Sequence, residues 1–203
     1  PTSGMQKVNR HILSTRPLPK AVVDDALTQG IAIEEVSFIE TIPVVDEKLQ
    51  KEIQAFSRQN IIAVFTSMNA VEAVANTIND KVGWTVYSIG SATERLVEEK
   101  LGVVVKASAA YAAELADKII RDKPAAVHFF CGNIRRDLLP QKLTQAGIGV
   151  HEIVVYQTIE TPKRISKHFD GILFYSPSAV ESFFSVNTVD AKTQLFAIGT
   201  TTA

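Results

Sequence analysis

The chain has 203 residues, with 21 Lys+Arg against 22 Asp+Glu and a formal net charge of −1 at pH 7. This length fits one large domain or two small ones, and the near-neutral charge excludes a polybasic wrap around nucleic acid or an anionic membrane. A hydrophobic content of 46% with 21% charged residues excludes disorder as the dominant state.

Signals for export and for membrane insertion are not found in the sequence pattern. The longest apolar runs, such as residues 61–65, have the length of a strand, far below the roughly 18 residues that span a bilayer. A single cysteine, Cys131, has no partner for an internal disulfide. We therefore expect a protein of the reducing cytoplasm, and we expect residues 1–4, which precede Met5, to be a cloning remnant.

Short apolar runs alternate with amphipathic stretches along almost the whole chain, which is typical of β-α-β units around a buried parallel sheet. Apolar residues at spacings of three and four, as in Val71, Val74 and Ala75, predict helices between the runs. In chain order, nine strands are predicted, at residues 12–16, 32–40, 61–66, 85–90, 103–106, 126–132, 150–158, 171–176 and 194–199.

An internal repeat is the most informative feature of the sequence. Gly30 and Thr41 recur as Gly147 and Thr158, at the same interval, within two similar segments. Two further pairs share a second common interval: residues 65–72 with 174–181, and residues 89–93 with 198–202. Three matches in register predict two domains of one fold.

One copy of the repeat is contiguous, whereas the other is split between the two ends of the chain. This predicts an α/β protein of two flavodoxin-like, doubly wound parallel-sheet domains, one inserted in the other. Residues 5–41 with 158–203 form the discontinuous first domain, and residues 44–154 form the inserted second domain. Two crossings, near 41–43 and 156–161, make a two-segment hinge, and we expect the ligand site in a cleft that opens and closes between the domains.

Hydroxyl-bearing residues and glycines follow the predicted strands. In parallel α/β sheets, ligands bind where the chain leaves the C-terminal end of a strand, near the free N–H groups of the next helix. Helix N-capping explains any one of these turns equally simply, but several similar turns favour a site for carboxylates or phosphates. The candidates are Thr15, Arg16, Thr66, Ser67, Gly90, Ser91, Thr93, Gly132, Asn133, Ser176, Ser178, Thr200, Thr201 and Thr202.

Two further features have open alternatives. Arg135 and Arg136 are predicted in the first turn of a helix, where the macrodipole disfavours cations. They either bind an external anion, or they pair with Asp137 or lie on a solvated face. Tyr156 ends an apolar run at the predicted domain crossing. It is either an aromatic residue at the edge of a core or a proton donor in the cleft.

Other chemistries find little support. The chain has no Walker sequence and no dinucleotide fingerprint, and its four histidines lack metal-ligand spacing. His128 and Cys131 share a predicted strand, but residues three apart on a strand point to opposite faces. We therefore expect no nucleotide cofactor, no metal and no Cys–His nucleophile.

At this point the chain resembles the uroporphyrinogen-III synthase family over nearly its whole length. No single motif is specific, but their order and spacing together are. The motifs that carry the resemblance are residues 15–17, 65–67 with 70–71, 90–93, 131–133 with 136 and 139–140, 155–158, 174–178 and 198–203. Thr200 stands where the family often has Pro. The family continues past the position of Ala203, so we expect the C-terminal part of the first domain to be missing from this sequence.

The resemblance implies a cofactor-independent lyase that cyclises hydroxymethylbilane to uroporphyrinogen III, with loss of water and inversion of ring D. It implies that Tyr156 assists departure of the ring A hydroxyl, and that the candidate turns, with Arg136, bind the substrate carboxylates. Loss of the hydroxyl gives an azafulvene, ring D attacks to form a spiro intermediate, and the protein's main task is orientation. Partners would be the linear tetrapyrrole and at most a transient contact with the preceding enzyme, with neither nucleic acid nor membrane, for a monomer in the cytoplasm.

Two rival functions remain open from sequence. A two-lobed, non-enzymatic receptor for an anionic small molecule would use the same turns. A nucleotide-sugar glycosyltransferase would need a nucleotide pocket, which the motifs do not supply.

Overall fold

The computed structural model describes residues 7–199 and 202. The chain divides into two compact units, and each is described by itself. Unit 1 holds the residues up to Glu40 and those from Ile159 onward, and unit 2 holds residues 41–158.

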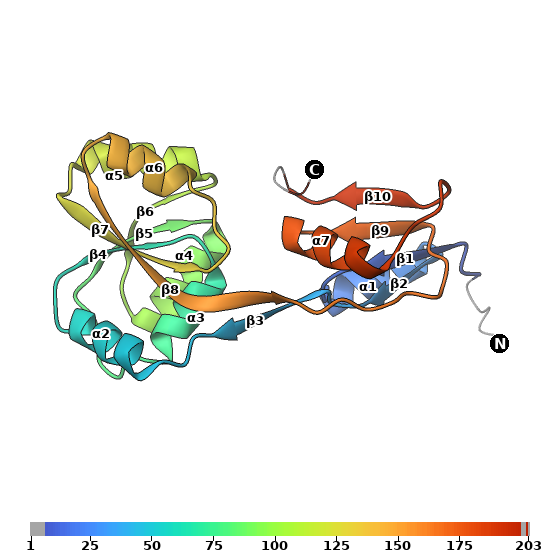
Figure 1. Cartoon of the computed structure of the whole chain (residues 1–203), viewed down its shortest axis with the longest axis horizontal. Coiled ribbons are helices and arrows are strands. Elements are labelled where there is room, and N and C mark those ends of the chain that lie inside the picture. Colours follow the sequence, from blue (N-terminus) through green and yellow to red (C-terminus); the bar gives the residue numbers. More distant parts are fainter. Residues whose placement is uncertain (1–6, 200–201, 203) are drawn as a thin grey trace. The chain divides into compact units, whose positions relative to one another are not determined.

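Unit 1 contains a four-stranded parallel sheet in the order β10-β9-β1-β2 (Figure 1). Its elements are β1 (Arg10–Ser14), α1 (Lys20–Thr28), β2 (Ile31–Glu35), β9 (Gly171–Phe174), α7 (Pro177–Val186) and β10 (Gln194–Ala197). Gly30 turns the chain from α1 into β2 with a φ of 78°, a backbone conformation that glycine adopts without strain.

The second sheet has six strands in the order β3-β8-β7-β4-β5-β6. Strands β8 to β6 pair in parallel. Its elements are β3 (Ile39–Pro43), α2 (Glu47–Ser57), β4 (Ile62–Phe65), α3 (Met68–Ala75), β5 (Thr85–Ile89), α4 (Ser91–Leu101), β6 (Val105–Ala109), α5 (Ala112–Asp122), β7 (Ala126–Gly132), α6 (Leu138–Gln145) and β8 (Gly149–Glu160). Helices α5 and α6 cover one face of this sheet, and α2, α3 and α4 lie on the other (Figure 1).

The strand orders confirm the predicted permuted repeat. Numbered along the chain, the strands of unit 1 run 2-1-3-4 across the sheet, which is the flavodoxin order as far as its fourth strand. The five parallel strands of unit 2 show the order 2-1-3-4-5 when β7 and β8 are counted first. Gly30 and Gly147 occupy the same place in the two copies, with φ of 78° and 80°.

The single strand predicted at residues 32–40 is wrong. The structure has two strands there, β2 and β3, in different sheets, so the described residues form ten strands rather than nine. Between them the chain bends, Val36 N–H donates to Ser14 O, and Phe38 is fully buried. The prediction failed because the chain carries apolar residues on both sides of the bend, and only the pairing partners separate the two strands. The strand predicted at 103–106 lies later, at Val105–Ala109.

Side chains pack into separate cores on the two faces of the unit 2 sheet. Phe65, Phe130 and Trp84 stack on the face of α2, α3 and α4, with ring centroids 5.2 Å (Phe65 to Phe130) and 5.5 Å (Trp84 to Phe130) apart. Leu115 and Leu143 pack on the face of α5 and α6. This two-sided burial explains why the strands are continuous apolar runs in sequence.

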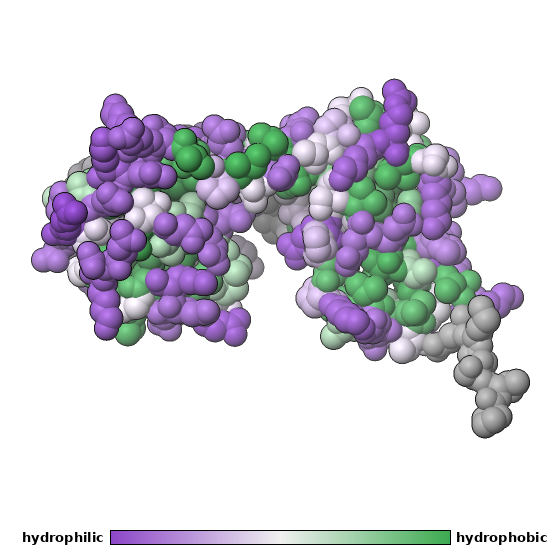
Figure 2. Space-filling view, turned by 90° about the horizontal axis from the view of Figure 1, so that it is seen from below, coloured by the Kyte–Doolittle hydropathy of each residue, from purple (hydrophilic) through white to green (hydrophobic). Residues whose placement is uncertain are grey.

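Charged and polar side chains occupy much of the surface shown in Figure 2, with apolar groups among them. Strand β10 contributes Leu195 and Phe196, which are both exposed. Among the helices of residues 7–199, none is both long enough and apolar enough to cross a membrane.

His128 predicts how the stability of unit 2 depends on pH. It is half-buried on the α2 side of β7, against the rings of Phe56 and His151. Burial lowers the pKa of His128, and the charge of His151 lowers it further, against the opposing effect of Glu52. A folded-state pKa below the unfolded one means that the unfolded chain binds more protons, so stability falls as pH drops below about 6.5.

Denaturant unfolding at pH 8 and pH 5 checks this expectation in the wild type and in His128→Phe. We expect the variant to lose less stability between the two pH values. Equal losses in both proteins would contradict a role for His128.

Candidate functional site

The two units have equivalent switch points, where the winding direction of the chain reverses. In unit 2 the switch lies between β4 and β7, and in unit 1 between β9 and β1. Ligands of open α/β sheets bind outside the carboxyl ends of the strands at such points. Ser67 and Gly132 follow or end the two strands in unit 2, and Arg16 and Ser176 follow them in unit 1.

In unit 2 the switch point brings together three of the predicted residues. Tyr156 lies on β8 opposite Gly132 of β7, and its hydroxyl donates to Ser67 Oγ at 3.1 Å. Ser67 also accepts from Ala70 N–H at 3.3 Å as the N-cap of α3. Ser67 therefore holds the half-buried phenol at the carboxyl ends of the central strands. Thr66, which precedes Ser67, is also half-buried.

Asn133 is exposed in the turn after β7 and bonds to the strand that carries the tyrosine. Its backbone N–H donates to Tyr156 O at 3.1 Å, and its side-chain Oδ1 accepts from Thr158 N–H at 2.8 Å. The predicted ligand contact of this side chain is thus used within the fold, as a link between the β7 turn and β8.

The turn after β5 differs from its neighbours because glycine begins it. Gly90 has a φ of 84° and caps α4 without a side-chain hydrogen bond. Ser91 is exposed at the first helical position, where helix N–H groups lack partners within the helix. Thr93, in contrast, is only 5% exposed, so its hydroxyl is largely removed from any ligand.

In unit 1 the switch point is built around Tyr175, which is not among the site residues predicted from the sequence. The Arg16 guanidinium lies 4.0 Å from the centre of the Tyr175 ring, a cation–π contact. The Tyr175 hydroxyl bonds Ser14 Oγ at 3.0 Å, while Ser14 donates to Arg16 O at 2.7 Å. Tyr175 occupies the repeat position of Thr66, so the repeat carried the signal that could have found it.

The other predicted site residues of unit 1 lie outside the group of Ser14, Arg16 and Tyr175. Thr15 is only 2% exposed and donates its hydroxyl to Leu173 O at 2.7 Å, so its side chain joins β1 to β9. Ser176 caps α7 by accepting from Ala179 N–H at 3.2 Å, and Ser178 is half-buried in the first turn.

The last predicted turn is only partly described. Thr200 and Thr201 lie outside the described residues. The Thr202 N–H donates to Gly199 O at 3.3 Å. Gly199 has a φ of 94°, like its repeat counterpart Gly90.

The predicted placement of Arg135 and Arg136 in the first turn of a helix is wrong. Helix α6 begins at Leu138, because a helix that began earlier would put Pro140 in its interior, where it would break a backbone hydrogen bond. Arg135 pairs with Glu152 of β8 at 2.5 Å, and Arg136 is exposed.

A Cys–His pair is ruled out at Cys131. The thiol lies in the core under α5 and α6, on the opposite face of β7 from His128. Burial raises the pKa of Cys131 to about 11, so the thiol is protonated at neutral pH. Among residues 7–199 and 202, no three His, Cys, Asp or Glu side chains gather as metal ligands.

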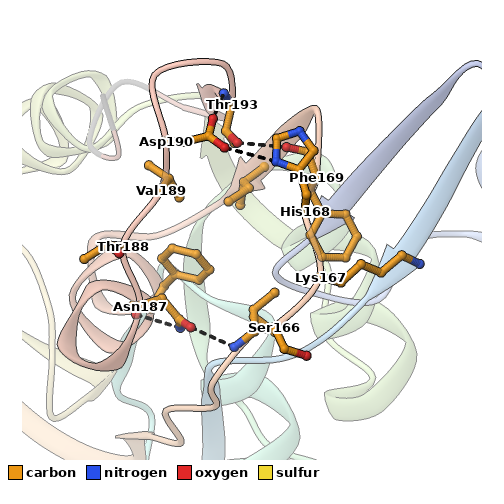
Figure 3. Close-up of a pocket in the computed structure, with 12 residues that line it drawn as sticks. Ser166, Lys167, His168, Phe169, Asn187, Thr188, Val189, Asp190 and Thr193 are labelled. Atoms are coloured by element: carbon orange, nitrogen blue, oxygen red, sulfur yellow. Dashed lines mark hydrogen bonds and ion pairs between the residues drawn. The ribbon is translucent and has the colours of Figure 1, made fainter.

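Unit 1 also has a cavity of about 230 Å³, which does not have the character of a ligand site (Figure 3). It lies beside the segments that precede β9 and β10, at the amino ends of the strands. Three of its polar side chains are engaged within the protein: Asn187 Oδ1 accepts from Ile165 N–H, Asp190 pairs with His168, and Thr193 donates to Phe169 O.

Two comparisons with known proteins, a family model and a curated relative, agree on one family. The family model described as Uroporphyrinogen-III synthase HemD matches residues 21–203. A curated uroporphyrinogen-III synthase of Saccharomyces cerevisiae is 30% identical over 134 residues, which is 61% of this chain and 46% of that protein. The chain thus matches less than half of the length of this relative.

Solved structures show the same fold at low sequence identity. A mutant uroporphyrinogen III synthase of Thermus thermophilus is 14% identical with a TM-score of 0.67, and the Helicobacter pylori enzyme is 17% identical with a TM-score of 0.64. Each match covers 96% of this chain and 86% of the other. With its strand order, its hydroxyl-rich switch points and a family model that matches most of its length, this chain belongs to the uroporphyrinogen-III synthase family.

Proposed function

We propose that this protein is a uroporphyrinogen-III synthase, which closes hydroxymethylbilane into uroporphyrinogen III with inversion of ring D and loss of water. Family membership supports the activity. The observation that carries it is the phenol of Tyr156, held at the unit 2 switch point by Ser67. Its hydroxyl is a proton donor at the kind of position where α/β proteins bind ligands.

Tyr156 is the acid of the proposed reaction. When the substrate binds, the Tyr156 hydroxyl donates to the ring A hydroxyl in place of Ser67 Oγ. The C–O bond breaks, the proton leaves with the hydroxyl as water, and the azafulvene cation remains. The carbon of ring D that closes the macrocycle later loses a proton, and this proton returns to the Tyr156 phenolate, so that the phenol is regenerated and only water is lost. A phenol suits this role because its O–H both donates a hydrogen bond and carries the proton that the leaving hydroxyl needs.

The substrate carboxylates are bound at turns of both units. Arg16 is exposed and oriented by Tyr175, and Ser91 lies at an open helix N-terminus; both features favour anions. Thr66, Ser176, Ser178 and Thr202 remain in the proposed set, with Arg136, Thr200 and Thr201. Thr15 and Thr93 are left out because they are buried. We further propose that the protein is a cytoplasmic monomer that meets the preceding enzyme of the pathway only transiently.

Product analysis tests this function. Hydroxymethylbilane is incubated with and without the protein, and the oxidised uroporphyrin isomers are separated by chromatography. We expect the type III isomer to dominate with the protein and type I to dominate without it. A receptor would bind the linear tetrapyrrole and leave type I as the product, which would overturn the proposal.

A further inference from the structure

Gly132 and Asn133 were selected from sequence as ligand contacts, but their surroundings point to another role. An added Cβ at Gly132 would lie 2.7 Å from both Cε2 and Cζ of Tyr156 and 3.0 Å from its hydroxyl. Real Cβ atoms do not approach so closely, so only glycine lets the phenol ring lie flat over β7. The backbone of Gly132 does not have a positive φ, so this requirement is steric and not conformational.

Asn133 fixes the same strand from the other side. It bonds β8 twice, at Tyr156 O and at Thr158 N–H, and so flanks the tyrosine with hydrogen bonds of 3.1 Å and 2.8 Å. The pairing of β7 with β8 shifts register between Cys131 and Gly132. A register shift leaves backbone groups of the ladder without their regular hydrogen-bond partners. The side-chain Oδ1 of Asn133 is such a partner for the N–H of Thr158.

We propose that Gly132 and Asn133 are positioning residues that place the Tyr156 hydroxyl on Ser67, and that neither binds the substrate. Gly132 provides the space for the ring, Asn133 fixes the backbone of the tyrosine, and Ser67 Oγ accepts the hydrogen bond of the Tyr156 hydroxyl. This role rests on the proposed function only where it concerns the rate, because the placement of the ring is a property of the free protein.

The first test needs no activity. The chain has four tyrosines, so ring-labelled tyrosine gives a simple NMR spectrum in which Tyr156 is assigned from its loss in Tyr156→Phe. We expect Gly132→Ala and Asn133→Ala to shift the Tyr156 signals, and Asn133→Asp, which keeps the accepting Oδ1, to shift them less. A matched control is Asn187→Ala, which removes the same kind of bond, from Oδ1 to the backbone N–H of Ile165 at 2.7 Å. Unchanged Tyr156 signals in Asn133→Ala would overturn the proposal.

The second test separates positioning from binding by kinetics. Because misplacement of a reacting group by about 1 Å costs up to about 100-fold, we expect Gly132→Ala to lower kcat by about 10- to 100-fold and Asn133→Ala by about 10-fold, with KM unchanged. In the Tyr156→Phe background, Asn133→Ala should have little further effect on kcat. A raised KM with normal kcat, or additive losses, would identify Asn133 as a substrate contact. If the wild type makes no type III isomer, the proposed function fails, while the NMR test still decides the positioning role.

Discussion

Replacement of Tyr156 by Phe is expected to lower kcat for uroporphyrinogen III formation by about 100-fold, the contribution of a typical general acid. The change removes only the hydroxyl that donates to Ser67 Oγ at 3.1 Å. The ring, which lies against Gly132, stays in place and keeps the fold. The initial rate of type III isomer formation under saturating substrate measures the effect.

Two further variants separate a role of Tyr156 in the chemistry from an effect on binding. Tyr111→Phe is the matched control, because Tyr111 is 68% exposed before α5 and has no place in the proposed site, so its rate should equal that of the wild type. Arg16→Ala should raise KM and leave the isomer ratio unchanged, as expected for a carboxylate contact. A Tyr156→Phe variant that retains the full rate would remove Tyr156 from the chemistry and leave substrate orientation as the main source of catalysis.

Much of the fold could be predicted because the repeat preserves residues that the backbone requires. Gly30 and Gly147 recur since both turns need a positive φ, and Ser67 and Ser176 recur since both cap a helix through the N–H three residues later. Such local requirements are visible in a single sequence. The order of the matched pieces then predicted that one domain is inserted in the other.

The site could be predicted only in part, because the use of a polar side chain depends on distant partners. Thr15 and Asn133 look like open turn residues in sequence, but Leu173 O and Thr158 N–H take their side-chain hydrogen bonds. The contact between Tyr156 and Gly132 depends on the register shift between β7 and β8, which no local pattern encodes. Tyr175 was missed since an aromatic residue after a strand is usually read as core.

Removal of the Phe130 side chain is expected to have the largest effect on stability. Phe130 is fully buried on β7, stacked between Phe65 and Trp84 with interplanar angles of 12° and 14°. Phe130→Ala leaves a cavity in this stack, because neighbours fixed by the sheet cannot close it. A loss of about 3–5 kcal/mol is typical of such a substitution, and it is a large part of the stability of an ordinary domain.

Fluorescence of Trp84 measures this loss in unit 2, since Trp84 is the only tryptophan of the chain and itself contacts Phe130. The free energy of unfolding is obtained from denaturant titrations followed at the Trp84 emission. Phe130→Leu should lose less free energy of unfolding than Phe130→Ala, because leucine keeps most of the apolar volume and still contacts Phe65. Val104→Ala, a change at a residue of unit 2 that is 82% exposed, serves as the surface control. A loss below about 1 kcal/mol in Phe130→Ala would contradict this expectation. It would mean that the neighbouring side chains move in and fill the cavity.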